Sequence, residues 1–278
     1  MRRANEARAD SGARGAAEAA AGAPPARLPP ILCYHKVDPR LELGVTRLSP
    51  RRFARQVARL ARDGWRALTL DELLACARGT RVAGEREVAI TFDDGYRALR
   101  EHAFPVLADH GFPAICSLIT DHVGRLNRWD VAYGGRRFAH LAWRDAERWR
   151  ARGIAFVSHT ATHRRLTWLD DGAVFDELAR SRDAMRAMLG EAPEVVSYPF
   201  GAAGQREFAL AQEAGYEAGF VLPERWGGDV MAIPRLPVYP WSSPTPGRGP
   251  LRALEWMGAV GANRCSVGTS YWRRLKGE

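Results

Sequence analysis

The sequence contains few cysteines, and their spacing excludes two common kinds of protein. Its four cysteines, Cys33, Cys76, Cys116 and Cys265, lie far apart, and no two of them form a CxxC pair. Thiolate zinc sites and disulfide scaffolds both depend on closely spaced cysteines, so neither is expected. Cys33 and Cys116 lie inside apolar runs, where a free cysteine behaves as a small hydrophobic residue.

Long apolar runs are also missing. No run approaches the roughly 20 residues of a membrane-spanning helix, so no transmembrane segment is predicted. The first 27 residues are rich in Ala, Arg and Gly and lack the apolar stretch of a secretory signal. We therefore expect residues 1–28 to be a disordered tail, or the result of a start codon assigned too early. The expected location is cytoplasmic by default, and exported if the start is misassigned.

Lysine is nearly absent. Only Lys36 and Lys276 among the 41 basic residues are lysines, and the formal net charge is +9. A basic chain can bind nucleic acid, but here the arginines are scattered along helical stretches rather than gathered into a block with interleaved aromatic residues. A biased codon pool explains this pattern as well, so no nucleic-acid partner is predicted. The sequence does not define an oligomeric state.

The order of the apolar runs predicts an α/β fold. From residue 30 onward, short β-branched runs such as 31–37 and 154–158 alternate with helical patterns such as 170–189. Repeated strand–helix units predict parallel strands joined by right-handed crossovers, and at least six units favour a closed or nearly closed barrel. We expect a single domain over residues 29–245 and a helical C-terminal extension over 246–278.

Two adjacent carboxylates follow one of these strands. In "VAITFDDGY", residues 88–96, Asp93 and Asp94 come directly after an apolar strand. In parallel α/β folds, chemistry gathers at the carboxyl ends of the strands, so both residues are expected at the mouth of the barrel. Capping of a helix that begins near Tyr96 is the alternative interpretation.

Two histidines follow another strand. The run "IAFVS" leads into "HTATH", which places His159 and His163 four residues apart. Two imidazoles and one carboxylate, with positions left open for water and substrate, form the ligand set of a catalytic divalent-metal site. Two solvated surface histidines are the alternative. Neighbouring residues that leave a strand point in different directions, so one carboxylate is expected to bind the metal and the other to accept a proton from the attacking water.

The two motifs in this order resemble those of the polysaccharide deacetylases, carbohydrate esterase family four, also called the NodB homology domain. The resemblance extends over roughly residues 30–240 and implies a distorted (β/α) barrel with metal-dependent N- or O-deacetylase activity. It makes Asp93 the general base and Asp94, His159 and His163 the metal ligands. Zinc is the expected cation, and cobalt, nickel or iron fit the same ligands.

"SYPFG", residues 197–201, is similar to the third motif of the family, which forms one side of the substrate groove. By this resemblance the backbone N–H of Phe200 faces the developing oxyanion. The predicted substrate-binding residues are Tyr198, Pro199, Phe200 and Trp226. Trp129 and Trp241 are further loop aromatics that could line a sugar groove, whereas Trp65, Trp143 and Trp149 are expected in the core or on helix faces.

The chain departs from the family pattern at two positions. The arginine that usually precedes the third motif is absent, and Arg235 in "IPRLPV" is the predicted substitute beside the base, as in the branch that acts on biofilm poly-N-acetylglucosamine. No histidine follows His163, so the usual late acid is missing as well. The "YH" pair of an early strand in that branch is similar to Tyr34 and His35 here, which makes His35 the predicted acid.

Four further histidines, His102, His110, His122 and His140, are interpreted as solvated. The predicted function is that of a hydrolase of carbon–nitrogen bonds other than peptide bonds, which removes acetyl groups from N-acetylated sugars of a poly- or oligosaccharide. The alternatives are an O-acetyl esterase or small-amide hydrolase that uses the same site, and a glycan-binding barrel without turnover.

Overall fold

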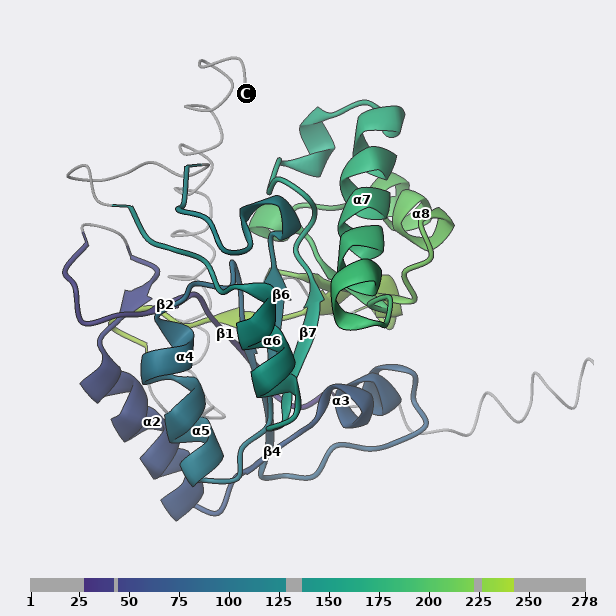
Figure 1. Cartoon of the computed structure of the whole chain (residues 1–278). Helices are drawn as coiled ribbons and strands as arrows, with labels where there is room; N and C mark the ends of the chain where they lie inside the picture. Colours follow the sequence, from purple (N-terminus) through teal and green to yellow (C-terminus); the bar gives the residue numbers. More distant parts are fainter. Residues whose placement is uncertain (1–27, 43–44, 129–136, 223–226, 243–278) are drawn as a thin grey trace, which may run out of the picture.

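The computed structural model describes residues 28–42, 45–128, 137–222 and 227–242 (Figure 1). Nearly all of the expected tail at 1–28, and the whole expected extension at 246–278, lie outside the described residues. Across the described ranges, no helix combines the length and the apolar character needed to cross a membrane.

Parallel strands form the centre of the fold. Eight of them are arranged in the order β10-β9-β8-β7-β6-β5-β1-β11, and β4 pairs with β5. Their bounds are β1 Ile31–Tyr34, β4 Arg66–Ala67, β5 Glu87–Phe92, β6 Ala114–Leu118, β7 Ile154–Ser158, β8 Val195–Ser197, β9 Ala218–Val221, β10 Ile233–Pro234 and β11 Leu236–Pro237. A separate parallel pair is formed by β2 Lys36–Val37 and β3 Arg47–Leu48. Because the paired strands are parallel, their carboxyl ends lie on one rim.

The barrel is almost closed. Strands β10 and β11 are the two edges of the eight-strand path, yet only Arg235 separates them in the chain. Strand β10 pairs with β9, and β11 pairs with β1. The polypeptide itself therefore spans the gap where a further ladder of hydrogen bonds would close a regular barrel. The predicted single-domain, distorted (β/α) barrel is confirmed, and the distortion lies at this seam.

Helices follow most of the strands and cover the outside of the barrel. Figure 1 shows α2, α4 and α5 together along one flank, and α7 and α8 along another. Their bounds are α2 Pro50–Arg62, α3 Leu70–Ala77, α4 Leu99–His102, α5 Phe104–Asp109, α6 Trp143–Arg150, α7 Asp171–Leu189 and α8 Gln205–Glu213. Short 3₁₀ turns occur at η1 Thr120–His122, η3 Leu166–Trp168, η4 Pro199–Gly201 and η5 Val230–Ala232.

Local sequence signals define the helix ends. Ser49 caps α2 through its side chain, and Pro50 occupies the first helical position, where a missing N–H costs nothing. Helix α7 ends at Leu189 and is capped by Gly190, whose φ of 82° suits a glycine. The segment after the two carboxylates forms two separate helices, α4 and α5, because Pro105 has no N–H to continue the hydrogen-bond ladder.

An aromatic cluster fixes the position of β5, the strand that precedes the two carboxylates. The ring of Phe92 lies 5.8 Å from that of Phe53 on α2 and 5.8 Å from that of Phe104 on α5. Trp149 is buried in the same core, and Trp65 and Trp143 pack against it, as the sequence predicts. This packing anchors the last residue of β5, so the next two side chains emerge at a defined point of the rim.

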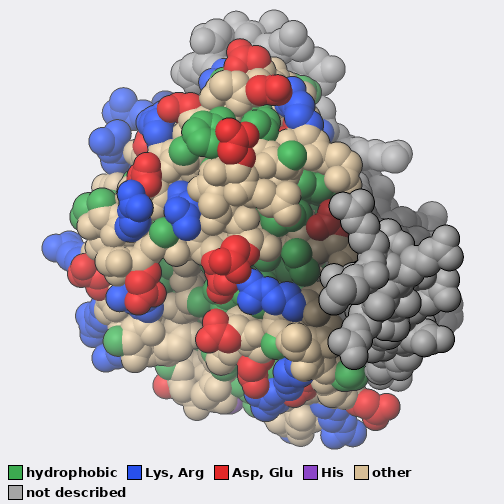
Figure 2. Space-filling view, turned by 90° about the vertical axis from the view of Figure 1, so that its right-hand side faces the viewer, with side chains coloured by type: hydrophobic (Ala, Val, Ile, Leu, Met, Phe, Trp, Pro, Cys, Tyr) green, Lys and Arg blue, Asp and Glu red, His purple; other side chains and the backbone are tan. Residues whose placement is uncertain are grey.

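The surface carries charges of both signs. On the face shown in Figure 2, Lys and Arg side chains are interspersed with Asp and Glu side chains rather than gathered into one continuous basic area.

Candidate active site

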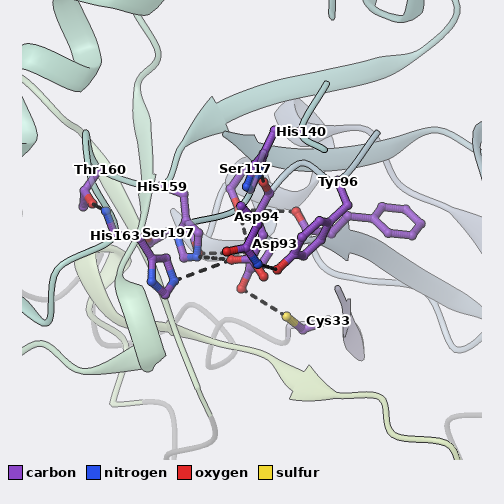
Figure 3. Close-up of polar contacts among 12 residues, drawn as sticks. Cys33, Asp93, Asp94, Tyr96, Ser117, His140, His159, Thr160, His163 and Ser197 are labelled. Carbon is purple, nitrogen blue, oxygen red and sulfur yellow. Dashed lines mark hydrogen bonds and ion pairs between the residues drawn. The ribbon is translucent and has the colours of Figure 1, made fainter. Parts of the chain in front are cut away.

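Polar side chains from three strand ends converge at the carboxyl rim of the barrel. Asp93 and Asp94 follow β5, His159 follows β7, and Ser197 is the last residue of β8. Figure 3 shows the carboxylates of Asp93 and Asp94 between the imidazoles on one side and Cys33 on the other. The predicted convergence of these segments is therefore present in the structure.

Asp94, His159 and His163 form a compact buried group. The Nε2 atoms of both imidazoles lie 3.5 Å from Oδ1 of Asp94 (Figure 3). The relative exposures of the three residues are 5%, 2% and 4%. The ligand atoms of all three lie within 4.8 Å of one another. The alternative of two solvated surface histidines is wrong, because both rings are buried against a carboxylate.

The orientation of His159 is set by its second ring nitrogen. Nδ1 lies 2.6 Å from the main-chain oxygen of Ser197, and a carbonyl oxygen only accepts, so Nδ1 carries the proton. Nε2 of a neutral ring then has its lone pair directed toward Asp94. A hydrogen bond of this kind to the second nitrogen is typical of metal-binding histidines, because it fixes both tautomer and ring orientation.

A glutamate from α7 holds the loop between the two histidines. Glu177 is buried and accepts hydrogen bonds from the main-chain N–H and the hydroxyl of Thr162. The main-chain oxygen of Glu177 accepts from Ala161. The i, i+4 spacing of His159 and His163 therefore acts through a loop fixed by α7, and not through a regular helix.

Unusual backbone conformations are concentrated at this site. Among the described residues, the non-glycine residues with positive φ are Asp94 (68°), Thr160 (64°), His163 (61°) and Phe200 (61°). Such conformations cost about 1–3 kcal/mol each and cluster at functional sites. Gly95 has a φ of 61°, and a Cβ there would lie 2.6 Å from Cδ2 of Leu118. The turn after Asp94 therefore requires glycine, and the backbone strain is located where two of the predicted metal ligands are.

Asp93 is held by hydrogen-bond donors on both of its oxygens. Oδ1 accepts from Ser117 Oγ at 2.6 Å, from Ser197 Oγ at 3.1 Å and from Arg235 Nη1 at 2.7 Å. Oδ2 accepts from Arg235 Nη2 at 2.8 Å and from the thiol of Cys33 at 3.4 Å. The capping alternative is wrong for Asp93, because its carboxylate faces these side chains. Arg235, the residue at the seam of the barrel, thus forms a bidentate ion pair with this carboxylate.

Charge and burial oppose each other at both carboxylates. Burial alone would raise the pKa of Asp93, but the Arg235 guanidinium and the nearby His159 hold it well below its usual range. Burial alone would likewise raise the pKa of Asp94, but the imidazoles of His159 and His163 lower it overall. Both groups are therefore carboxylates at neutral pH.

His35 lies next to this pair. It follows β1, whose register pairs Cys33 with Thr91 and Tyr34 with Phe92, so the next residue reaches the level of Asp93. One ring nitrogen of His35, Cys33 Sγ and a carboxylate oxygen of Asp93 all lie within 4.8 Å of one another. His35 is partly exposed. Burial lowers its pKa, although the Asp94 and Asp93 carboxylates act in the opposite direction.

The structure corrects the interpretation of His140 as a solvated residue. His140 is buried, and its Nδ1 lies 2.7 Å from the main-chain oxygen of Asp94. Its ring stacks on Tyr96 with centroids 5.0 Å apart. His110 is exposed as expected, whereas His102 and His122 are partly buried. No local pattern indicated His140, because the segment 138–141 reaches the site only by folding back over residues 95–97.

The predicted substrate residues are placed differently from one another. Tyr198 has 0% exposure and packs against Phe208, so its side chain faces the core and not a groove. Pro199, the next residue, is also buried. Phe200 is partly exposed, and its ring lies 4.8 Å from that of His163. Trp226 and Trp129 lie outside the described residues.

The two serines that hold Asp93 were missed by the sequence analysis, although a signal for them exists. Ser117 and Ser197 are single small polar residues in otherwise apolar strands, close to the carboxyl ends of those strands. Thr91 occupies a similar position in β5, where Arg235 contacts its hydroxyl at 3.4 Å. At these three positions a polar residue near the end of a buried strand faces the Asp93 carboxylate or its Arg235 partner, whereas Ser158 at the end of β7 faces Ser181 on α7 instead.

The residues present fit a divalent cation. Adjacent ligands of a tetrahedral zinc ion with bonds of about 2.0–2.1 Å are about 3.3–3.4 Å apart, and the two N–O separations here are 3.5 Å. Asp93 is balanced by Arg235, but the ion-pair partners of Asp94 within the part of the chain that the structure describes are the two imidazoles, with no Lys or Arg among them. The group offers borderline nitrogen and oxygen donors in a negative environment, which suits zinc and similar metals.

The fold and this site define a parallel α/β barrel with a candidate divalent-metal centre at its carboxyl rim. A model of the polysaccharide deacetylase family matches residues 80–219, half of the chain, and the protein therefore belongs to that family.

Similar proteins are found among curated sequences and solved structures. YxkH of Bacillus subtilis, described as a candidate polysaccharide deacetylase, is 28% identical over 195 residues, which cover 70% of this chain and 64% of YxkH. A poly-β-1,6-N-acetyl-D-glucosamine N-deacetylase of Staphylococcus aureus is 23% identical over 64% of this chain and 62% of its own length. The matches thus span less than two thirds of both relatives.

Two solved structures support the fold. The deacetylase PplD of Streptococcus pyogenes, determined in complex with acetate, has a TM-score of 0.68 at 20% identity and covers 78% of this chain and 94% of its own. IcaB from Ammonifex degensii has a TM-score of 0.67 at 24% identity, with 85% of this chain and 99% of its own covered.

Proposed function

We propose that this protein is a metal-dependent hydrolase that removes acetyl groups from N-acetylated sugars of a poly- or oligosaccharide. The observation that carries the proposal is the pairing, at one rim, of a carboxylate fixed by Arg235 with a buried Asp, His and His group. Such a pairing provides a proton acceptor next to a Lewis-acid site, which is what hydrolysis of an unactivated amide requires.

Asp94, His159 and His163 would hold the cation, most simply zinc, with cobalt, nickel or iron as alternatives. A divalent cation in this position supplies polarisation of the acetyl carbonyl and lowers the pKa of water. The chain contributes ligands that are already oriented, since His159 is fixed by the Ser197 carbonyl and the loop to His163 by Glu177.

Asp93 accepts the proton of the attacking water. Its Oδ1 already receives three hydrogen bonds, whereas Oδ2 receives one from Arg235 and one from a weakly donating thiol, so Oδ2 is the atom available for the proton. Arg235 lowers the pKa of Asp93, so the carboxylate is a weaker base. The same ion pair holds the carboxylate in a fixed orientation. We therefore expect the catalytic activity of Asp93 to depend on the intact triad of Asp94, His159 and His163 beside it.

His35 donates a proton to the departing amine. As the C–N bond breaks, the amine nitrogen takes this proton, and the products are acetate and a free amino sugar. The main-chain N–H of Phe200 is the proposed donor to the developing oxyanion, supported by the contact of Phe200 with His163. Arg235 acts through Asp93 and is a positioning residue.

Exposed aromatic residues favour a sugar polymer over a small amide. Trp241 is 58% exposed, and its ring is stacked on Tyr239 at 5.2 Å. It follows β11, the neighbour of the strand that leads to His35. Trp168 is 38% exposed, and Arg165 lies over both Trp168 and Phe200. Exposed flat aromatic faces of this kind suit sugar rings next to the one that is deacetylated. Similarity to a poly-N-acetylglucosamine deacetylase points to the same class.

Acetate release from a panel of acetylated compounds tests the proposal. The metal-loaded protein is incubated with poly-β-1,6-N-acetylglucosamine oligomers, chitin oligomers, an O-acetylated glycan and a small N-acetyl amide. We expect release from an N-acetylated oligomer, loss of release in Asp93→Asn, and a higher KM for oligomers in Trp241→Ala. Release from the ester or the small amide alone would favour the other hydrolase activities. No release from any compound would favour a binding role and contradict the proposal.

A further inference from the structure

A second group of potential metal ligands lies beside the triad. Cys33, His35 and Asp93 each contribute one donor atom, and these atoms lie within 4.8 Å of one another. Cys33 and His35 are two residues apart at the end of β1, so both side chains face the same side of the sheet. The register of β1 with β5 brings them next to Asp93. This group shares no residue with the Asp94, His159 and His163 group.

The spacing of sulfur and oxygen in this group is that of two ligands on one metal ion. Cys33 Sγ lies 3.4 Å from Oδ2 of Asp93. With a zinc–sulfur bond of about 2.3 Å and a zinc–oxygen bond of about 2.0–2.2 Å, two ligands of a tetrahedral ion are about 3.5 Å apart. A cation can therefore take the place of the thiol proton between the two atoms without moving either strand.

We propose that Cys33, His35 and Asp93 form a second cation site, which takes a soft divalent ion such as zinc or cadmium. On binding, the S–H bond of Cys33 breaks, its proton leaves to solvent, and a sulfur–metal bond forms. Thiolate, imidazole and carboxylate together are a donor set that zinc and cadmium prefer, whereas magnesium prefers oxygen alone.

The charges and the exposure around this group predict that it binds a cation more weakly than the triad does. Arg235 stays within 2.8 Å of both Asp93 oxygens, so its positive charge opposes a cation there. Cys33 and Asp93 are buried, and His35 is partly exposed and forms the open side. The donor atoms of the three residues lie up to 4.8 Å apart, and rotation of the His35 side chain would bring its ring nitrogen closer to Cys33 and Asp93. The site is therefore expected to fill only after the triad is occupied.

Occupation of this site would inhibit the enzyme, a consequence that rests on the proposed function. The ion would engage Oδ2 of Asp93, the atom assigned to the water proton, and the ring of His35, the assigned acid. Excess soft metal would thus remove base and acid together while leaving the triad intact. The binding itself does not depend on turnover and can be measured separately.

Cadmium titration tests the site. Protein that carries one equivalent of zinc is titrated with cadmium, and metal content and thiolate-to-cadmium charge-transfer absorption are recorded alongside acetate release. The variant is Cys33→Ser, which keeps a small donor next to Asp93 but is a poor ligand for cadmium. The matched control is Cys116→Ser, because Cys116 is also buried in a central strand but lies outside the group. Magnesium serves as the hard-cation control.

We expect a second equivalent of cadmium with charge-transfer absorption in the wild type and in Cys116→Ser, but not with magnesium. In Cys33→Ser the absorption should be lost and the second binding weakened at least tenfold. His35→Ala should weaken it while retaining the absorption. Equal absorption or equal affinity in Cys33→Ser, or no second equivalent in the wild type, would overturn the site. Acetate release with unchanged cadmium inhibition in Cys33→Ser would refute this site alone, whereas cadmium binding at Cys33 without acetate release would refute the proposed function alone.

Discussion

Asp93 and Asp94 are neighbours in the chain, and both are buried at the same rim, but their carboxylates are held in different ways. Asp93 receives hydrogen bonds from two serines, one thiol and both terminal nitrogens of Arg235. Asp94 faces two imidazole nitrogens, each 3.5 Å from one of its oxygens. The first carboxylate is thus neutralised by the protein, and the second has a partner set that suits an added cation.

The backbone shows why adjacent residues reach such different surroundings. The main-chain N–H of Asp93 still donates to the carbonyl of Tyr34, as an extension of the pairing between β5 and β1. Asp94 then has a φ of 68°, and Gly95 continues with a φ of 61°. The chain turns between the two residues, so one side chain faces the Arg235 seam and the other faces the end of β7. We call the Asp93 and Arg235 pair the Asp93 side and the Asp94, His159 and His163 group the Asp94 side. Because the two carboxylates have separate partners, a change on one side should leave the function of the other side intact.

Removal of the metal should have the largest effect and should act on the Asp94 side alone. Treatment with a strong chelator is expected to reduce acetate release more than about 10⁴-fold, because several kcal/mol of charge stabilisation and the acidified water are lost together. Zinc or cobalt should restore it. The circular-dichroism spectrum should not change, since the Asp93 and Arg235 pair remains. Full activity in protein shown to be free of metal would contradict the assignment of the triad.

Asp93→Asn tests the other side with a nearly isosteric change. We expect kcat to fall by about 10²–10⁴-fold, the usual contribution of a positioned general base. One equivalent of metal should still bind, because Asp94, His159 and His163 are intact. His163→Ala is the matched counterpart, for which both metal content and kcat should fall. Loss of metal in Asp93→Asn would show that the two sides are not separable.

The two sides also differ in how well the sequence predicts their residues. The acids and the histidine pair follow apolar runs, and the order of those runs defines the parallel strands, so their common rim follows from local pattern alone. Arg235 has no such signal. It reaches Asp93 because β10 and β11 close the barrel around it, and closure is a property of the whole sheet. Only resemblance to a known family pointed to it.

The positions of loop residues are also poorly predicted by local sequence patterns. His140 lies in a segment without strand or helix periodicity, and its contact with Asp94 depends on bridges between that segment and residues 95–97. Tyr198 was expected in the groove because it belongs to "SYPFG", which resembles the third motif of the family, but it is buried beside Gly219, at which a Cβ would lie 2.8 Å from its hydroxyl. Position at a strand end predicts the rim, and it does not predict which way each side chain turns.

Arg235→Gln should destabilise the fold more than it disturbs the triad. The change leaves Asp93 as a buried charge without its ion-pair partner, and such losses cost about 3–5 kcal/mol in the free energy of unfolding, measurable with urea. A double-mutant cycle with Asp93→Asn checks the cause. If the pair acts as a unit, the double variant should be less destabilised than the sum of the two single variants. Additive effects would show that Arg235 stabilises the seam independently of Asp93.

His140→Ala should weaken metal binding on the Asp94 side by about 10–100-fold, the usual effect of removing a hydrogen bond that supports a metal ligand. His140 Nδ1 donates to the Asp94 carbonyl at the residue with a φ of 68°, so its loss lets that peptide relax and turns the carboxylate away from the imidazoles. His140→Asn retains a donor at a similar position and should recover most of the affinity. The exposed His110 supplies the control through His110→Ala, which should match the wild type. Metal affinity is measured by competition with a chromophoric chelator. If His140 were needed only for its stacking on Tyr96, His140→Asn would bind metal as weakly as His140→Ala.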